Sequence, residues 1–248
     1  MNWSKYISQF MDSMSSEVYQ KLLLKGLMNT VLIAVSGLII GIIIGTLIAA
    51  IKVYPKYTLL PKILDKLGTI YVGIFRGTPI AVQLLVTYYV LLPMMGLRIP
   101  AFYVGVIVYG MNSGAYVAEI MRSGFNSVDG GQLEAGRSLG LSYGVSMMKI
   151  VVPQAIKNIL PTLGNEFITL IKETSVLSFI TVVDLYTALM TRIGGENYEF
   201  VIPSLVLAAI YIILVSLITL LIKLIERIMS KSDRRRGNVK KKSKGANA

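Results

Sequence analysis

Four long stretches of this 248-residue chain carry no charged side chain. An α-helix needs about 20 mostly apolar residues to cross the hydrocarbon layer of a membrane, and each stretch is long enough to do so. Only 15% of the residues are charged, which is too few to cover a soluble fold of this size with polar surface. The sequence therefore predicts an all-α integral membrane protein whose spans include residues 26–51, 77–97, 99–118 and 200–222.

A fifth apolar segment, residues 158–191, is interrupted by four charged side chains. The distribution of positive charge decides whether it crosses the membrane, because Lys and Arg gather on the cytoplasmic side. With five spans, 18 of the 25 Lys and Arg residues fall in the cytoplasmic segments 52–66 and 122–157 or in the C-terminal tail. Four spans would place the basic tail and the 52–66 segment on opposite sides. We therefore expect five transmembrane helices, with the N-terminus outside and the C-terminus in the cytoplasm.

The two ends of the chain differ in character from the membrane part, which covers residues 22–229. Residues 1–21 repeat apolar side chains at helical spacing, which favours a short helix on the outer membrane surface over an unstructured leader. These apolar positions are Trp3, Ile7, Phe10, Met14 and Val18. Residues 230–248 are basic and almost without apolar side chains, so we expect a disordered cytoplasmic tail. Basic charge behind a span is typical of a topology signal that faces membrane lipids, and no nucleic acid partner is expected.

The residue types that carry much enzymatic and metal chemistry are missing. The chain has no Cys and no His, which excludes disulfides, thiol nucleophiles, imidazole catalysis and zinc sites built on these ligands. One stretch, Gly131–Ser138, reads G-x-x-x-x-G-R-S and approaches the phosphate loop of nucleotide-binding proteins. That loop follows a buried strand and requires Lys where this chain has Arg137. We therefore expect no catalytic residue, no metal site and no ATP bound by this chain.

The same stretch belongs to a longer pattern in the cytoplasmic segment 122–157. From Glu134 the chain reads EAGRSLGLSYGVSMMKIVVP, which resembles the EAA motif of the permease subunits of ATP-binding-cassette (ABC) importers. Gly136 stands in place of the second alanine of that motif, and Val152 stands in place of a leucine. The residues that carry the resemblance are Glu134, Ala135, Gly136, Gly140, Ile150 and Pro153.

The residues of this segment also predict a helix–turn–helix without reference to any family. Asp129 and Arg137 suit the two ends of a helix dipole, and Gly140 can adopt the positive φ of a sharp turn. Such a hairpin either docks in a groove of a soluble partner or lies on the membrane surface. The EAA resemblance implies docking to an ATPase subunit, as a coupling helix–turn–helix. The apolar face expected to dock is formed by Tyr143, Met147, Ile150 and Val151.

Two further segments resemble signatures of the polar amino acid branch of these permeases, the histidine and glutamine permease-like family. They are Ile74–Gln83, with RGTP followed by Gln, and Asn165–Ser175, with N-E-x-x-x-L-x-K-E-T-S. With the EAA motif, the resemblance covers about residues 20–228. It implies a type I ABC importer fold in the cytoplasmic membrane of a bacterium or archaeon, where this chain and a second copy or a homologous permease form the translocation path.

The resemblance also implies the partners and the cargo. The cargo would be a polar or basic amino acid or cystine, delivered by an extracytoplasmic amino-acid-binding protein. ATP and Mg²⁺ would act in a dimer of ATPase subunits, so this chain would bind no cofactor and would not itself be an enzyme.

Polar residues within the apolar segments are candidates for the substrate path. The RGTP stretch should break a helix, because Pro79 lacks a backbone donor. The freed backbone groups then either face a cavity or are sealed by neighbouring helices. Glu166, with Asn165 and Thr169, is the choice for part of the site that binds the substrate ammonium group. Arg76 or backbone N–H groups are the candidates for the carboxylate. The path candidates are Arg76, Thr78, Gln83, Asn112, Tyr116, Glu119, Asn165, Glu166 and Thr169.

Two groups of these residues have a second interpretation. Asn112, Tyr116 and Glu119 share one helical face, and they either line the path or mark the membrane interface. Lys172 and Glu173 are gate candidates, and for them we favour a structural ion pair over substrate binding, because paired buried charges often only neutralise each other.

Two other classes of function compete with an importer permease. A self-contained transporter could couple to protons through a relay of Glu119, Glu166 and Glu173, and it would work without an ATPase. A membrane anchor could recruit a soluble partner through the segment 122–157, and it would show no dependence on any substrate.

Overall fold

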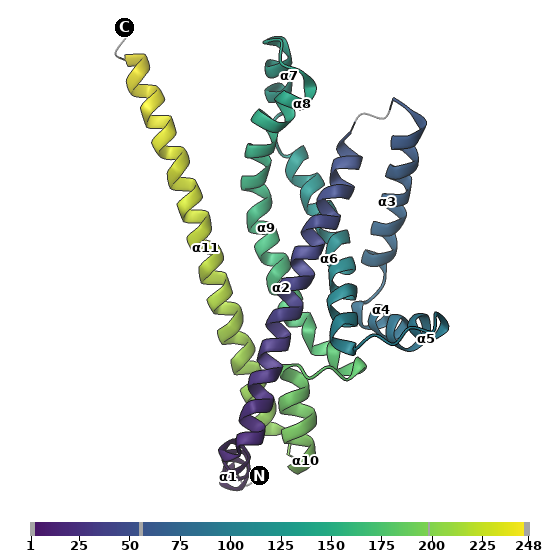
Figure 1. Ribbon diagram of the computed structural model, residues 1–248. Coiled ribbons are helices and arrows are strands. Elements are labelled where there is room, and N and C mark those ends of the chain that lie inside the picture. Colours follow the sequence, from purple (N-terminus) through teal and green to yellow (C-terminus); the bar gives the residue numbers. More distant parts are fainter. Residues whose placement is uncertain (1–2, 55–56, 198, 246–248) are drawn as a thin grey trace.

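The computed structural model describes residues 3–54, 57–197 and 199–245, without the side chains of Asn197 and of the residues after Met229. Every regular element in these ranges is helical, as predicted (Figure 1). The long helices are α2 (Glu17–Val53), α3 (Leu59–Gly77), α6 (Ala101–Asn126), α9 (Val152–Glu173) and α11 (Val201–Gly245). The short ones are α1 (Trp3–Ser15), α4 (Ile80–Val86), α5 (Leu92–Met94), α7 (Gly130–Ser138), α8 (Tyr143–Ser146) and α10 (Gly195–Asn197). The π-helical segments are η1 (Thr87–Leu91), η2 (Met147–Val151) and η4 (Thr187–Gly194), and η3 (Thr174–Ile180) is a 3₁₀-helix.

Three helices are long and apolar enough to cross a membrane, namely α2, α6 and the part of α11 up to Met229. α3 together with the α4–α5 segment passes the same test as a broken span, bent by 103°. α9 packs against α2 and α6 (Figure 1) but carries charged residues and is not among these helices, so the count of five spans stays a prediction. α1 and the last turns of α11 lie at opposite ends of the molecule (Figure 1), as an odd number of crossings requires.

The apolar run 77–97 does not form the single straight span that its length predicts. α3 already covers the residues before it, and the chain turns by 103° between α3 and α4. Thr78 has the extended backbone that a residue before proline prefers, and Pro79 has no N–H for a helical hydrogen bond. α3 does not appear in the sequence as an uncharged run, because Lys62 and Lys66 interrupt its first half. Long side chains of this kind can lie along a helix and reach the membrane surface.

Two other predicted boundaries differ from the structure. The segment 158–191 is not one helix, because a 3₁₀ stretch follows α9 and the chain reverses at Thr181, whose φ is +64°. The predicted disordered tail, residues 230–248, is instead helical up to Gly245 as a continuation of α11. Lys and Arg are good helix formers, so a helix that leaves the membrane can propagate into a basic segment. Residues 246–248 lie outside the described residues.

The N-terminal segment contains the helix that its apolar spacing predicts, α1, which packs against α2 and α11. Its apolar residues divide between two sides. Trp3 and Ile7 are each 49% exposed, whereas Phe10 and Met14 are partly buried. Val18 already belongs to α2. The exposed side therefore keeps an aromatic and an aliphatic residue available for a membrane surface.

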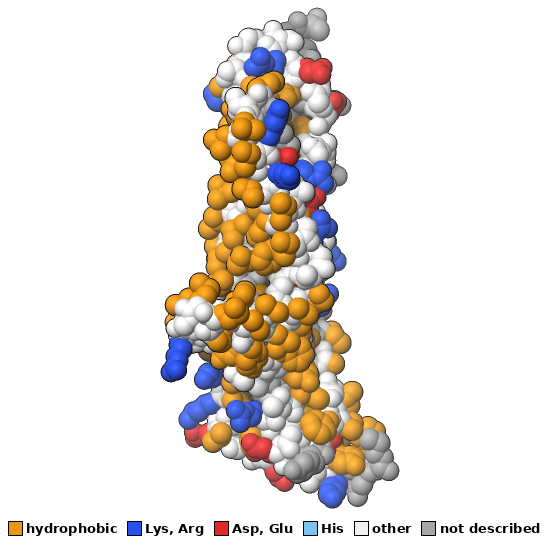
Figure 2. Space-filling model, turned by 90° about the vertical axis from the view of Figure 1, so that its right-hand side faces the viewer, with side chains coloured by type: hydrophobic (Ala, Val, Ile, Leu, Met, Phe, Trp, Pro, Cys, Tyr) orange, Lys and Arg blue, Asp and Glu red, His pale blue; other side chains and the backbone are white. Residues whose placement is uncertain are grey.

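The centre of the bundle is the contact between α2 and α6. Glycines spaced one turn apart on α2 face α6, and the two backbones approach closely, as small residues permit in membrane helices. A Cβ atom added to each would lie 2.9 Å or less from an α6 side chain. The facing pairs are Gly37 with Tyr109, Gly41 with Ser113 and Gly45 with Val117. The side of the molecule drawn in Figure 2, seen after a 90° turn from Figure 1, has apolar side chains over its middle. Charged side chains lie toward its two ends and along one edge.

Candidate functional site

The elbow between α3 and α4 is sealed by two side-chain amides. Gln83 Nε2 donates to the carbonyl oxygens of Phe75 and Thr78 at 2.9 and 3.0 Å, and to Thr78 Oγ1 at 2.9 Å. Asn112 Nδ2, on α6, donates to Gln83 Oε1 at 3.0 Å and to the Phe75 carbonyl at 3.2 Å. Of the two outcomes expected for the broken helix, the structure shows the sealed one: carbonyls released by the break bond to Gln83 and Asn112.

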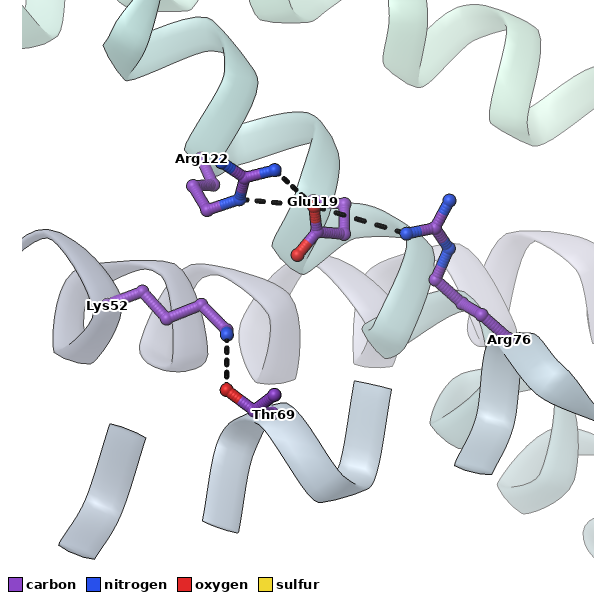
Figure 3. A network of polar contacts seen from close by, with 5 residues as sticks. All are labelled: Lys52, Thr69, Arg76, Glu119 and Arg122. Carbon is purple, nitrogen blue, oxygen red and sulfur yellow. Dashed lines mark hydrogen bonds and ion pairs between the residues drawn. The ribbon is translucent and has the colours of Figure 1, made fainter. Parts of the chain in front are cut away.

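Arg76, in the last turn of α3, reaches toward the α6 face that carries the other predicted polar residues. Its Nη1 lies 4.0 Å from Glu119 Oε2, and its guanidinium lies 5.3 Å from the centre of the Tyr116 ring. Glu119 is bound more tightly by Arg122, whose Nη2 and Nε lie 2.6 and 3.1 Å from the same oxygen (Figure 3). The end of α3 therefore lies against the α6 face that carries Asn112, Tyr116 and Glu119.

Positive charge exceeds negative charge in this network. Lys52, at the end of α2, donates to Thr69 Oγ1 at 2.8 Å beside the same cluster (Figure 3). Among the described residues, Arg76 has only a long ion pair and a ring contact, and its side chain is 44% exposed. An exposed guanidinium with a poorly matched carboxylate can still bind an anion such as a substrate carboxylate. The sequence analysis did not single out Lys52, Thr69 or Arg122. Only the fold brings Lys52 and Thr69 beside this cluster, whereas Arg122 is three residues after Glu119 on the same helix, so helical spacing could have identified it.

Glu166, on α9, faces α6. Its Oε1 accepts a hydrogen bond from Ser113 Oγ at 3.0 Å, and Ser113 is fully buried. Among the described residues no Lys or Arg pairs with Glu166. The neighbouring candidates lie elsewhere, since Asn165 is exposed and Thr169 Oγ1 donates to the backbone carbonyl of Asn165 at 3.1 Å. A partly buried carboxylate without a cation is suited to bind an ammonium group.

Lys172 and Glu173 do not form the predicted ion pair in the part of the chain that the structure describes. Consecutive residues on a helix point about 100° apart, so the two side chains make no direct ion pair, although the charge of Lys172 still acts on the Glu173 carboxylate. Lys172 instead lines a pocket of about 430 Å³ between the end of α9, η4 and α11. The buried hydroxyl of Tyr211 has no hydrogen-bond partner among the described residues. The pocket is lined by Lys172, Ser175, Tyr186, Met190, Ser204, Leu207, Ala208 and Tyr211.

The hydroxyl groups that line this pocket were not predicted from the sequence. They lie on three elements that are far apart in the chain, and Ser and Tyr are common in apolar helices without any binding role. The signal that could have identified them is their spacing on α11, where Ser204 and Tyr211 are seven residues apart and so share a face with Leu207 and Ala208.

Residues 122–157 contain the predicted helix–turn–helix. Asp129 caps α7, accepting from Gly131 N at 2.9 Å, and Arg137 lies in the last turn. Gly140 has φ +82°, and a second helix begins at Tyr143. These predicted features are confirmed. We call residues 129–151 the hairpin.

Gly136, the departure from the EAA pattern, has a structural reason. A Cβ atom at this position would lie 2.7 Å from Ile150 Cδ1 and 2.8 Å from Ser146 Oγ. The two arms of the hairpin are therefore closer than an alanine would allow. Glu134, Ala135 and the terminal Pro153 are all exposed, whereas Ile150 packs between the arms.

The predicted docking face of the hairpin is turned partly toward the chain's own helices, so its role in docking stays a prediction. Tyr143, Met147 and Val151 turn toward the ends of α2 and α6, where they line a pocket of about 360 Å³. Helical spacing identifies an apolar face but does not show what lies against it. Here the ends of α2 and α6 lie against this face. The apolar side chains left exposed on the hairpin are Leu139, Leu141, Val145 and Met148. Leu139 and Met148 are 82% and 66% exposed.

Solved membrane subunits of transporters share this fold. One chain of an amino acid ABC transporter crystallised with histidines superposes with a TM-score of 0.78 at 39% identity, covering 87% of this chain and 97% of that one. The MetNI methionine ABC transporter in an inward-facing conformation superposes with a TM-score of 0.72 at 19% identity, over 86% of this chain and 98% of that one. The second likeness concerns the fold alone. The chain therefore has the helical fold of type I ABC permeases.

The family follows from the sequence match. Residues 37–231 match the family described as the inner membrane component of binding-protein-dependent transport systems, and the chain belongs to this family. An arginine transport system permease protein of Bacillus subtilis is 38% identical over 128 residues, which are 52% of this chain and 58% of that protein. A Rickettsia typhi protein, provisionally named a glutamine transport system permease, is 43% identical over 124 residues. That match spans 50% of this chain and 56% of the relative, so the alignment covers about half of each.

Proposed function

We propose that this chain is the membrane-spanning permease subunit of an ABC importer for a polar or basic amino acid. The observation that carries the proposal is the hairpin, whose capped, closely packed arms present exposed apolar residues at one end of a membrane bundle. Exposed leucine and methionine on a rigid element outside the membrane are suited to a groove on a soluble partner. The family and the motif beginning at Glu134 support an ATPase subunit as that partner, which would bind ATP and Mg²⁺.

The interior of the bundle supports a path for a zwitterion. Glu166 offers a carboxylate without a cation to an ammonium group, and Arg76 or Lys172 offers a cation to a carboxylate. Lys172 lines the pocket of about 430 Å³ and makes no direct ion pair with Glu173 among the described residues. The permease would pair with a second copy or a homologue and receive its amino acid from an extracytoplasmic binding protein. The hairpin would face the cytoplasm and α1 the outer membrane surface.

Purification in a mild detergent tests the proposal directly. We expect an ATPase subunit to co-purify with the chain, and we expect the reconstituted assembly to hydrolyse ATP faster when an amino acid and its binding protein are added. Amino acid uptake driven by a proton gradient without any ATPase would identify a proton-coupled transporter instead. Co-purification without any effect of an amino acid would identify a membrane anchor.

Glu166→Gln is expected to weaken substrate recognition. Loss of a charge-assisted bond to the ammonium group should raise the KM for transport roughly tenfold to hundredfold, while the assembly with the ATPase remains intact. Uptake of the radiolabelled amino acid by vesicles measures the KM. Glu17→Gln is the matched control, because Glu17 is an exposed carboxylate that pairs only with Lys21 on the same helix. An unaltered KM in Glu166→Gln would exclude Glu166 from substrate binding.

A further inference from the structure

The donors and acceptors at the elbow of the broken span can be assigned in one way. We call residues 78–94 the arm, which comprises the turn and the α4–η1–α5 segment. The amide of Gln83 can only be oriented with its nitrogen toward Phe75 and Thr78, because the opposite orientation would place Oε1 against two carbonyl oxygens. Its oxygen then accepts from Asn112 on α6. Donors and acceptors alternate correctly, so the bonds of the three elements depend on one another.

This amide pair differs in kind from the charged contact beside it. Arg76 and Glu119 are 4.0 Å apart, and the Arg76 side chain is 44% exposed, so solvent and salt weaken their attraction. The amide of Gln83 is partly buried, and Asn112 is 4% exposed. Hydrogen bonds between neutral groups carry no net charge, so pH and ionic strength affect them little. Of the contacts at the elbow, the amide pair is the one suited to persist in every state of the protein.

α6 connects the arm to the hairpin along the chain. Its first residue, Ala101, follows closely after the arm, and its last residue, Asn126, precedes the hairpin. A straight helix transmits a rotation from one end to the other only if the element at the far end is attached to it. The arm is also held at its other side, where Leu84 is fully buried and Tyr89 Oη donates to the Phe179 carbonyl at 3.1 Å.

We propose that Gln83 and Asn112 are positioning residues that lock the arm to α6, so that the arm, the last turn of α3 and α6 move as one body when the permease changes shape. A displacement of the hairpin then reaches the arm without loss in a flexible elbow. The reason for such a displacement rests on the proposed function, whereas the lock itself is a property of this chain.

The lock can be measured with spin labels, since the chain contains no Cys. Met94→Cys labels the end of the arm, where the side chain is 80% exposed, and Ser123→Cys labels an exposed position near the end of α6. Labelled protein is diluted with unlabelled protein, so that an assembly carries at most one labelled copy. We expect one narrow distance distribution, and we expect the same distribution in the assembly without nucleotide and after trapping with ATP and vanadate.

Gln83→Leu is expected to broaden this distance distribution, and Gln83→Glu should do the same, because glutamate keeps the size but loses the donors that face the two carbonyls. Asn112→Leu added to Gln83→Leu should broaden it no further, since both residues serve one network. Glu119→Gln is the matched control, and its distribution should stay narrow. The lock would be overturned if the distance between labels 94 and 123 differed between nucleotide states while Gln83 and Asn112 are unchanged. It would also be overturned if the distance distribution stayed narrow in Gln83→Leu.

Transport gives a second readout. Unsatisfied carbonyls at the elbow should lower the maximal transport rate of Gln83→Leu by roughly tenfold to hundredfold, with little change in KM and with the ATPase still bound. A change in KM alone would make Gln83 a substrate contact and not a positioning residue. If the unaltered assembly shows no ATP-driven transport, the proposed function fails, and the label distances in the purified chain still decide whether the lock exists.

Discussion

Leu139→Asp is expected to detach the ATPase subunit from the permease and to abolish ATP-driven transport. Leu139 is 82% exposed beside the turn of the hairpin, next to Gly140 with its φ of +82°. Burying a leucine side chain completely contributes about 2 kcal/mol, and an aspartate in its place would have to be buried without a partner. The affinity between the two subunits should therefore fall by at least about thirtyfold. Pull-down of the ATPase and vesicle uptake measure the two effects.

The matched control for this variant is Tyr57→Asp. Tyr57 is a large apolar residue, 90% exposed, in the connection between α2 and α3. The Tyr57→Asp substitution introduces the same charge outside the hairpin, and we expect the ATPase to stay bound to this variant. Met148→Asp, at the second exposed position of the hairpin, should behave like Leu139→Asp. Normal ATPase binding and uptake by both hairpin variants would show that the hairpin is not the docking element.

Gly45→Leu is expected to prevent α2 from packing against α6. A Cβ atom on Gly45 would lie 2.6 Å from the Val117 Cβ and 2.7 Å from the backbone nitrogen of Ala118, so a backbone would have to move. Overpacking of this kind costs about 3 kcal/mol or more when the neighbour cannot yield. We expect a large loss of folded protein in detergent, measured as the fraction that remains monodisperse after heating.

Gly73→Leu is the matched control for the glycine seam. It places the same side chain in a membrane helix at a position where a Cβ atom would meet nothing within 4 Å. The isolated chain should therefore keep its thermal stability. Equal stability of Gly45→Leu and Gly73→Leu would mean that the close approach of α2 and α6 does not hold the bundle together.

Part of the candidate site could be predicted because its residues lie close together in the sequence. Asp129, Arg137 and Gly140 specify a capped helix and a turn by local rules alone, and the hairpin follows them. The shared face of Asn112, Tyr116 and Glu119 follows from helical spacing. By contrast, the buried side of the hairpin could not be predicted, because covering it depends on where α2 and α6 end in space.

The sequence by itself determined the helical membrane class, the elbow and the hairpin, since each depends on hydrophobic length, on proline or on a glycine turn within one short segment. Only the tertiary structure decided which polar groups meet. It joined Gln83 to Asn112, Glu166 to Ser113 and Arg76 to Glu119, and it left the adjacent Lys172 and Glu173 without a direct ion pair in the part of the chain that the structure describes. The physical reason is that helical periodicity fixes the direction of a side chain relative to its own helix, whereas its partner depends on how neighbouring helices pack.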